Sequence, residues 1–128
     1  MGTENITGGT PVKPYPPKIV IADSLPDSAA DLLREMGWKV DARAKRSREK
    51  LLHDLKDADG LIVRSNTQVD AELLASAPQL KVIARAGTGI ENIDVGAASA
   101  RGILIINAPG ANSVSVAEHT CALMLALG

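Results

Sequence analysis

The chain has 128 residues, enough for one domain, and its 45% apolar and 23% charged residues are the ordinary composition of a globular protein. The formal net charge of −1 provides no basic excess for nucleic acid or a membrane surface, so we expect neither as a partner. A single cysteine excludes an internal disulfide and a cysteine metal cluster, which suits a reducing cytoplasm and predicts no bound metal.

The first 17 residues are rich in Gly, Thr and Pro and show no apolar periodicity. They lack the apolar centre of a signal peptide and the Arg-rich, acid-poor composition of a mitochondrial presequence. We interpret 1–17 as a disordered tail, with regular structure beginning at Lys18.

From Lys18 onward, short β-branched runs alternate with helical patterns. The predicted strands are 18–22, 38–42, 60–64, 81–86 and 103–107. Ser24 and Asp27 form a capping box for the first helix, and Gly37 is placed to close it. Ser47 starts the second helix, and further helices are predicted at 70–76 and 95–100.

The strands at 60–64 and 103–107 are apolar on both sides of the pleat, which is typical of parallel strands covered by helices on both faces. The alternation of strands and helices favours the same arrangement. We therefore predict an α/β fold, a flavodoxin-like doubly wound parallel sheet of five strands in the order 2-1-3-4-5. The more polar strand at 38–42 is expected at an edge.

The last predicted helix, at 116–127, follows a second capping box made by Ser115 and Glu118. Its final residues leave it without a polar face, and a helix that is apolar all round must be buried on every side. Either another part of the protein or a partner subunit covers it, or it inserts between the other helices of this domain.

Ligands of open α/β sheets bind at the carboxyl ends of the strands, where the strand order reverses. For the predicted order this crevice lies between the first and third strands. Arg64 ends the third strand, where its guanidinium would hold a carboxylate or phosphate, and the Gly87–Gly89 turn would let backbone amides approach a ligand. Small polar side chains near the same edge are Ser65, Asn66 and Asn112. Together these residues predict a small-anion site.

Plain structural interpretations stay open for each of these residues. Arg64 could pair with a surface acid, the Gly-Thr-Gly turn could be only a tight turn, and Asn112 could be only a turn or cap residue. The glycine pair is not a dinucleotide fingerprint, because Asn92 stands where the third glycine belongs. His53 and His119 read as helix-surface residues and Cys121 as a core residue, so the residues alone indicate no general acid, no general base and no cofactor site.

Three segments carry a family resemblance that covers 18–127: GLIVRSNTQV at 60–69, VIARAGTGIENIDV at 82–95 and GILIINAPGANSVSVAEHT at 102–120. They resemble the first domain of the D-isomer-specific 2-hydroxyacid dehydrogenases, and within that family the phosphoglycerate dehydrogenase branch. The resemblance implies two doubly wound domains with the active site between them. It also implies NAD as cofactor, a phosphorylated 2-hydroxy acid as substrate, a role in serine biosynthesis and a homo-oligomer at full length.

The resemblance also assigns roles to particular positions. Thr88 would touch the cofactor. The implied substrate-binding residues are Arg64, Ser65, Arg85, Ala86, Gly87 and Asn112. In the family the glycine-rich NAD motif, the catalytic arginine and the glutamate–histidine pair come later in the chain. We therefore expect no catalytic residue here, and an inactive fragment.

The corresponding domain boundaries are a tail at 1–17, the substrate-binding domain at 18–114, and the start of a helix at 115–128 that leads into a missing NAD-binding domain. Two other functions stay open. One is a different member of the family, such as a glyoxylate or hydroxypyruvate reductase, which needs only a carboxylate contact. The other is a non-catalytic, ligand-binding member.

Overall fold

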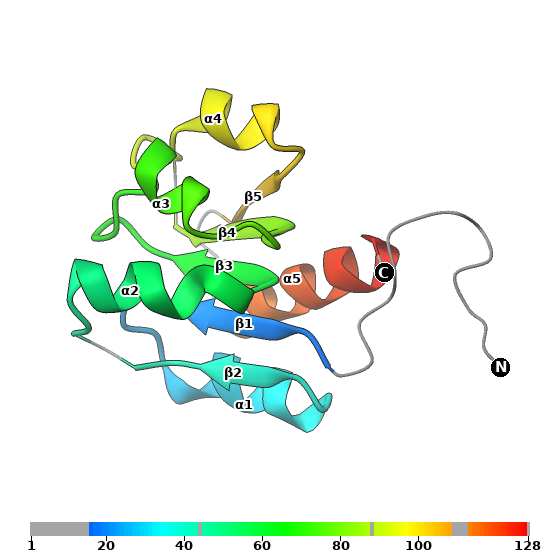
Figure 1. Cartoon of the computed structure of the whole chain (residues 1–128). Coiled ribbons are helices and arrows are strands. Elements are labelled where there is room, and N and C mark those ends of the chain that lie inside the picture. Colours follow the sequence, from blue (N-terminus) through cyan, green and yellow to red (C-terminus); the bar gives the residue numbers. More distant parts are fainter. Residues whose placement is uncertain (1–15, 44, 88, 109–112, 128) are drawn as a thin grey trace, which may run out of the picture.

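The computed structural model describes residues 16–43, 45–87, 89–108 and 113–127, so most of the predicted tail lies outside the described residues. Strands and helices alternate as the sequence predicts, with one 3₁₀ turn, η1, at Leu55–Asp57 (Figure 1). The strands are β1 (Lys18–Ile21), β2 (Lys39–Asp41), β3 (Gly60–Val63), β4 (Val82–Ala86) and β5 (Leu104–Ala108). The helices are α1 (Asp27–Glu35), α2 (Arg48–Asp54), α3 (Ala71–Ala75), α4 (Val95–Ala100) and α5 (Ser113–Leu127).

The five strands form one sheet in the order β2-β1-β3-β4-β5, and every neighbouring pair is parallel. The predicted topology is therefore confirmed. Leu61 of β3 lies between Val20 of β1 and Ile83 of β4, which places three apolar residues in one row across the centre of the sheet. The polar strand β2 lies at the edge, as predicted.

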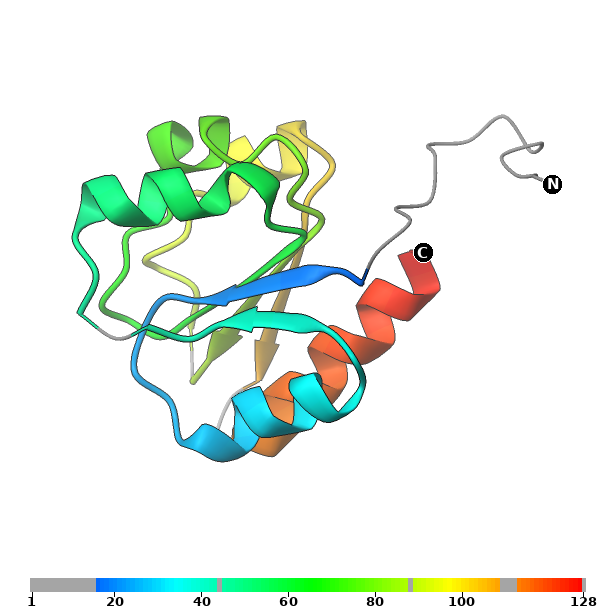
Figure 2. The ribbon, with the colours of Figure 1, turned by 60° about the horizontal axis from the view of Figure 1, so that its bottom comes forward.

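Helices cover both faces of the sheet, and Figure 2 shows the resulting three layers. On one face, Leu61 and Ile83 pack with buried residues of α2, α3 and α4. On the other, Ile62 and Ala84 pack with buried residues of α1 and α5. The alternation of strand side chains thus divides the core into two apolar clusters, one on each side of the sheet.

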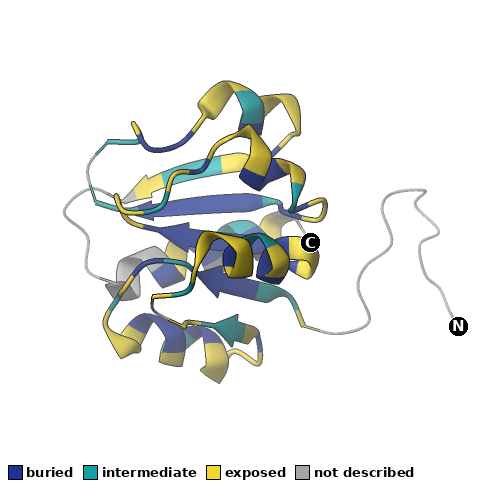
Figure 3. Cartoon of the chain, turned by 60° about the vertical axis from the view of Figure 1, so that its left-hand side comes forward, coloured by how far each residue is buried: buried dark blue, intermediate teal, exposed yellow. Residues whose placement is uncertain are grey.

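The two strands predicted to be buried on both faces differ in the structure. All four residues of β3 are buried, as predicted (Figure 3). β5 is an edge strand, and its Leu104 is 42% exposed, so that part of the prediction is wrong. An apolar run identifies a strand, but the number of neighbours beside it decides how far the strand is buried.

Two of the predicted helix caps are wrong. Pro26 occupies the N-cap of α1 and no side chain caps that end. A proline disfavours helical conformation in the residue before it, so the helix cannot begin at Ser24. Ser115 lies inside α5, which starts at Ser113, and so it cannot cap that helix. By contrast, Ser47 accepts a hydrogen bond from Lys50 N at 3.1 Å, as predicted for an N-cap.

Gly37 ends α1 as the sequence predicts. Its φ of +86° lies in the left-handed region that glycine adopts without a Cβ clash. Its backbone N–H donates to the carbonyl of Arg34 at 2.9 Å, which satisfies one of the free carbonyls at the helix end.

A buried ion cluster joins the ends of β1 and β2 to α2. The side chain of Arg46 is only 3% exposed, and its two terminal nitrogens lie 2.9 Å from Asp54 and 3.1 Å from Asp41. Arg46 also donates to the carbonyl of Ile21 at 3.2 Å. The hydrogen bond from Arg43, aided by the charge of Arg46, holds the pKa of Asp41 well below its usual range, although burial acts in the opposite direction.

Within the described residues, no helix has the length and apolar character needed to cross a membrane. In the same residues, no group of three or more His, Cys, Asp or Glu side chains is arranged to hold a metal ion.

We predict that Arg46→Ala lowers the free energy of unfolding by about 3 kcal/mol at pH 7, because Asp41 and Asp54 lose their buried cation and keep only contacts with the exposed Arg43 and Lys50. Arg34→Ala is the control, since Arg34 is half-exposed and lies 3.8 Å from Asp31 on the helix surface. Arg34→Ala should lower the free energy of unfolding by less than about 1 kcal/mol. Urea denaturation measures both, and equal losses would contradict the structural role of the Arg46 cluster.

The same cluster predicts a pH dependence. The folded-state pKa of Asp41 is depressed, so its stabilising contribution is present above the unfolded pKa of about 4 and is lost as the pH falls below it. Asp41→Asn should therefore reduce the slope of stability against pH in the acid range, as urea midpoints between pH 2 and 7 would show.

Candidate functional site

The parallel strands bring the predicted site residues to one edge of the sheet. Val63 lies opposite Arg85 in the β3–β4 register, and Ala86 lies opposite Ala108 in the β4–β5 register. Arg64 and Gly87, which follow these strands, therefore leave the sheet at the same edge. This confirms the predicted gathering of the strand ends.

A cleft of about 580 Å³ opens where the strand order reverses, between the ends of β1 and β3. Its wall includes Asp23, Ser24, Asn66 and Thr67, all of which the sequence places after these two strands. The segment 45–48 completes the wall. It follows β2, which is parallel to β1, and so it lies at the same edge, which the sequence reasoning did not take into account. Asn66 of the predicted anion site lines the cleft, whereas Arg64 and Ser65 do not.

The turn Arg64–Thr67, which follows β3, is held by two buried polar side chains. The carboxylate of Asp23 accepts hydrogen bonds from Arg64 N at 2.6 Å, Thr67 N at 3.3 Å and Thr67 Oγ1 at 2.6 Å. The amide of Asn92 donates to the carbonyls of Arg64 and Thr67, both at 2.7 Å. Sequence reasoning missed both roles, since Asp23 precedes the turn by about 40 positions and Asn92 follows it by about 25.

Arg64 itself is exposed at the end of β3. Its Nη1 lies 3.3 Å from the carbonyl of Ser24, and it forms no salt bridge with any residue that the structure describes. Ser65, next to it, is also exposed. The alternative in which Arg64 pairs with a surface acid is thus not seen within the described part of the chain.

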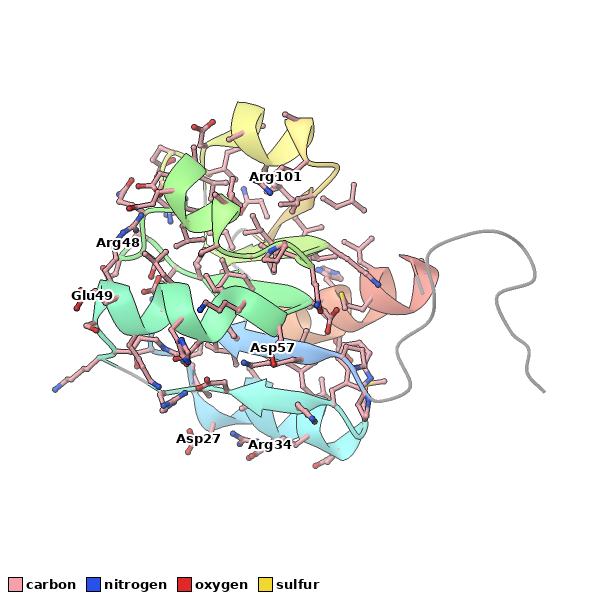
Figure 4. The ribbon with its side chains drawn as sticks, in the orientation of Figure 1. Asp27, Arg34, Arg48, Glu49, Asp57 and Arg101 are labelled. Atoms are coloured by element: carbon pink, nitrogen blue, oxygen red, sulfur yellow. The ribbon has the colours of Figure 1, made fainter. Side chains whose placement is uncertain are left out.

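The arginines that line the cleft are held by carboxylates, whereas Lys45, which also lines it, is exposed and forms no salt bridge within the described residues. Arg46 belongs to the buried cluster described above. Arg48, labelled in Figure 4, reaches from the start of α2 to Asp70 at 2.6 Å and Glu72 at 3.1 Å, which flank the start of α3. These contacts raise the pKa of Arg48. The hydrogen bond from Leu73 N, and then that from Arg48, lower the pKa of Asp70. These arginines connect helices rather than present free charge to the cleft.

Arg85 is predicted to add positive charge near the site, but in the structure it lies against a carboxylate. It is 5% exposed, and its Nη1 is 3.3 Å from Glu91 Oε1. The pKa of Glu91 is lowered, first by the hydrogen bond that its carboxylate accepts from the backbone N–H of Glu91 itself, and then by the charge of Arg85. Since Arg85 is paired with Val63, the pleat directs it to the face covered by α2, α3 and α4. Arg64 and Arg85 therefore reach the same edge without converging.

The remaining predicted site residues lie in and after β4. Ala86 and Gly87 are half-buried, and Gly87 has a φ of +131°. Gly89 has a φ of +82°, so both glycines use conformations that L side chains rarely adopt. Thr88 and Asn112 lie outside the described residues.

This glycine turn does not fit the pyrophosphate of a dinucleotide. A pyrophosphate site needs a glycine-rich turn that leads directly into a helix N-terminus. Here Asn92 replaces the third glycine, is buried, and donates to two carbonyls, and α4 begins only at Val95. His53 and His119 are exposed on α2 and α5 and do not line the cleft.

We predict that Gly89→Ala disturbs the Arg85–Glu91 pair. A Cβ at this position would collide with a carboxylate oxygen of Glu91 and lie 3.1 Å from Arg85 Nη1. Gly102→Ala is the matched control, because Gly102 has a similar φ of +73° and no atom within 4 Å of the added Cβ. Each variant should lose about 1 kcal/mol of stability. Only Gly89→Ala should shift the NMR resonance of the Arg85 guanidinium, and an unchanged resonance would contradict the contact.

The chain is similar to known proteins in both sequence and structure. The family model described as "D-isomer specific 2-hydroxyacid dehydrogenase, catalytic domain" matches residues 19–123. The D-3-phosphoglycerate dehydrogenase of Mycobacterium tuberculosis (strain ATCC 25618 / H37Rv) is 51% identical over 112 residues, which are 86% of this chain and 21% of that protein.

Solved structures give the same result. The NAD⁺-bound 3-phosphoglycerate dehydrogenase of Entamoeba histolytica has a TM-score of 0.68 and 33% identity, covering 75% of this chain and 34% of the other. An NADPH-dependent glyoxylate/hydroxypyruvate reductase of Sinorhizobium meliloti has a TM-score of 0.60 and 29% identity, and the match covers 73% of this chain and 28% of the reductase chain.

The chain spans about a fifth of the length of the curated relatives that it matches. The family model, in contrast, matches most of the chain, including all five strands of the sheet except the first residue of β1. The chain belongs to the family of D-isomer-specific 2-hydroxyacid dehydrogenases.

Proposed function

We propose that this chain is the substrate-binding portion of an NAD-dependent D-3-phosphoglycerate dehydrogenase, a cytoplasmic enzyme of serine biosynthesis. The complete enzyme would oxidise 3-phosphoglycerate to 3-phosphohydroxypyruvate and reduce NAD⁺ to NADH. The curated relatives at 45–51% identity are named for this activity, which supports the proposal.

One observation of the structure carries the assignment of the site. At the carboxyl edge, Arg46, Arg48 and Arg85 each contact a carboxylate, whereas Arg64 is exposed and forms no salt bridge within the described residues. A guanidinium in this state binds a phosphate or carboxylate without first breaking a strong ion pair. Arg64 is therefore the residue that we assign to the substrate anion, with Ser65 beside it.

The chain's own contribution is binding and orientation. Arg64 would attract and fix the anionic group, and Ser65 would add a directional hydrogen bond. The half-buried Ala86 and Gly87 would form the adjoining wall, with Thr88 and Asn112 completing it toward cofactor and substrate. Because the described residues do not form a pyrophosphate site, we assign NAD binding and proton transfer to the rest of the enzyme. At full length we expect a homo-oligomer.

A reductase of glyoxylate or hydroxypyruvate is the second candidate, since the Sinorhizobium meliloti structure of that activity shares the fold at 29% identity. Those substrates carry a carboxylate and no phosphate. The ratio of kcat/KM for phosphohydroxypyruvate to that for hydroxypyruvate separates the two, and a ratio below one would favour the reductase.

We predict that Arg64→Ala in the complete dehydrogenase raises KM for 3-phosphoglycerate about tenfold or more, since a lost charge-assisted hydrogen bond costs roughly 1.5–3 kcal/mol. Arg34→Ala, which removes an exposed arginine from the outer surface of α1, should leave KM unchanged. Steady-state kinetics of both variants with 3-phosphoglycerate measure the two KM values. Unchanged kinetics for Arg64→Ala would make that arginine a surface residue.

We also predict that the 128-residue chain alone shows no turnover of 3-phosphoglycerate and no NAD affinity in the micromolar range. The reason is the missing pyrophosphate site described above. Titration calorimetry with NAD, with the complete dehydrogenase as positive control, tests the binding. A micromolar dissociation constant would place a cofactor site within this chain.

A further inference from the structure

The turn Arg64–Thr67 is fixed at both ends by two side chains of opposite hydrogen-bonding character. Asp23, which is 8% exposed, accepts from the backbone N–H groups of Arg64 and Thr67 and from the Thr67 hydroxyl. Asn92, which is 6% exposed, donates to the carbonyls of the same two residues. The backbone N–H and the backbone carbonyl of both Arg64 and Thr67 are thus hydrogen-bonded.

The middle of the turn is left available. Ser65 and Asn66 are exposed and make no hydrogen bond with any residue that the structure describes. Their side chains and backbone N–H groups therefore remain donors for a ligand, next to the guanidinium of Arg64. A turn held at its ends and open at its middle is a preformed binding surface.

We propose that Asp23 and Asn92 are positioning residues, which hold the Arg64–Thr67 turn in the conformation that binds the substrate anion. This inference rests on the proposed function of Arg64. Donors that are already in place when the anion arrives lose little conformational entropy on binding. Without the two buried side chains the turn would sample other conformations, and each binding event would have to order it.

A purely structural role is the alternative, and the chain contains a matched control for it. Asp59 is also a buried aspartate, 1% exposed, which precedes β3 and accepts a hydrogen bond from Lys18 N at 2.9 Å. It therefore binds backbone beside the same two strands, β1 and β3, but at the opposite edge of the sheet from Arg64. Loss of Asp59 should lower stability without altering the anion site.

The experiment compares Asp23→Ala with Asp59→Ala in the complete dehydrogenase, assayed below the melting temperature of both variants. We expect Asp23→Ala to raise KM for 3-phosphoglycerate about fivefold or more and to leave KM for NAD within about twofold. Asp59→Ala should leave both values within about twofold. Asn92→Ala, which releases the turn from the carbonyl side, is tested by the same criteria and replaces Asp23→Ala if that variant does not fold.

A double-mutant cycle with Arg64→Ala separates positioning from general damage. If Asp23 acts through Arg64, then Asp23→Ala should change KM by less than about twofold once Arg64 is absent. Equal effects with and without Arg64, or no effect of either positioning variant on KM, would overturn the positioning role while leaving the proposed function intact. If Arg64→Ala alone is silent, the proposed anion site fails as well.

Discussion

Burial of the central strands on both faces is the constraint on which the rest of this molecule depends. β1, β3 and β4 carry apolar side chains in both directions, so helices must cover both sides of the sheet. Strands joined through covering helices run parallel, and parallel strands end at a common edge. The place of the site therefore follows from how the core is buried, and the residues after each strand determine what the site binds.

The four arginines at this edge divide into three that contact carboxylates of the fold and one, Arg64, that does not do so within the described residues. Arg46 joins β1, β2 and α2 in a buried cluster, and Arg48 joins α2 to the start of α3. Arg85 lies against Glu91 below the glycine turn. Arg64 alone of these four is exposed without a carboxylate partner among the described residues. In the proposed function, stability and anion binding therefore depend on different arginines, although all four lie near the same strand ends.

The sequence predicts the elements and their order well, because those depend on local apolar patterns and on a small set of connection rules. It fails where a feature depends on a neighbour that is distant in the chain. The exposure of Leu104 depends on β5 having a strand on one side only, and the direction of Arg85 depends on its register with Val63. The Ser24 cap is an avoidable error, since Pro26 is visible in the sequence and disfavours a helical residue before it.

The two side chains that hold the turn could not be predicted from local patterns, yet their chemical identities follow from the structure. At position 23 two backbone N–H groups and a hydroxyl converge, and a carboxylate accepts from all three. At position 92 two carbonyls converge, and an amide NH₂ has two protons to donate to them. An amide at position 23 would direct donors at donors in one of its two orientations, and a carboxylate at position 92 would face two carbonyl oxygens. Because both residues bind the backbone of the turn, they leave the side chains of Arg64 and Ser65 available for recognition.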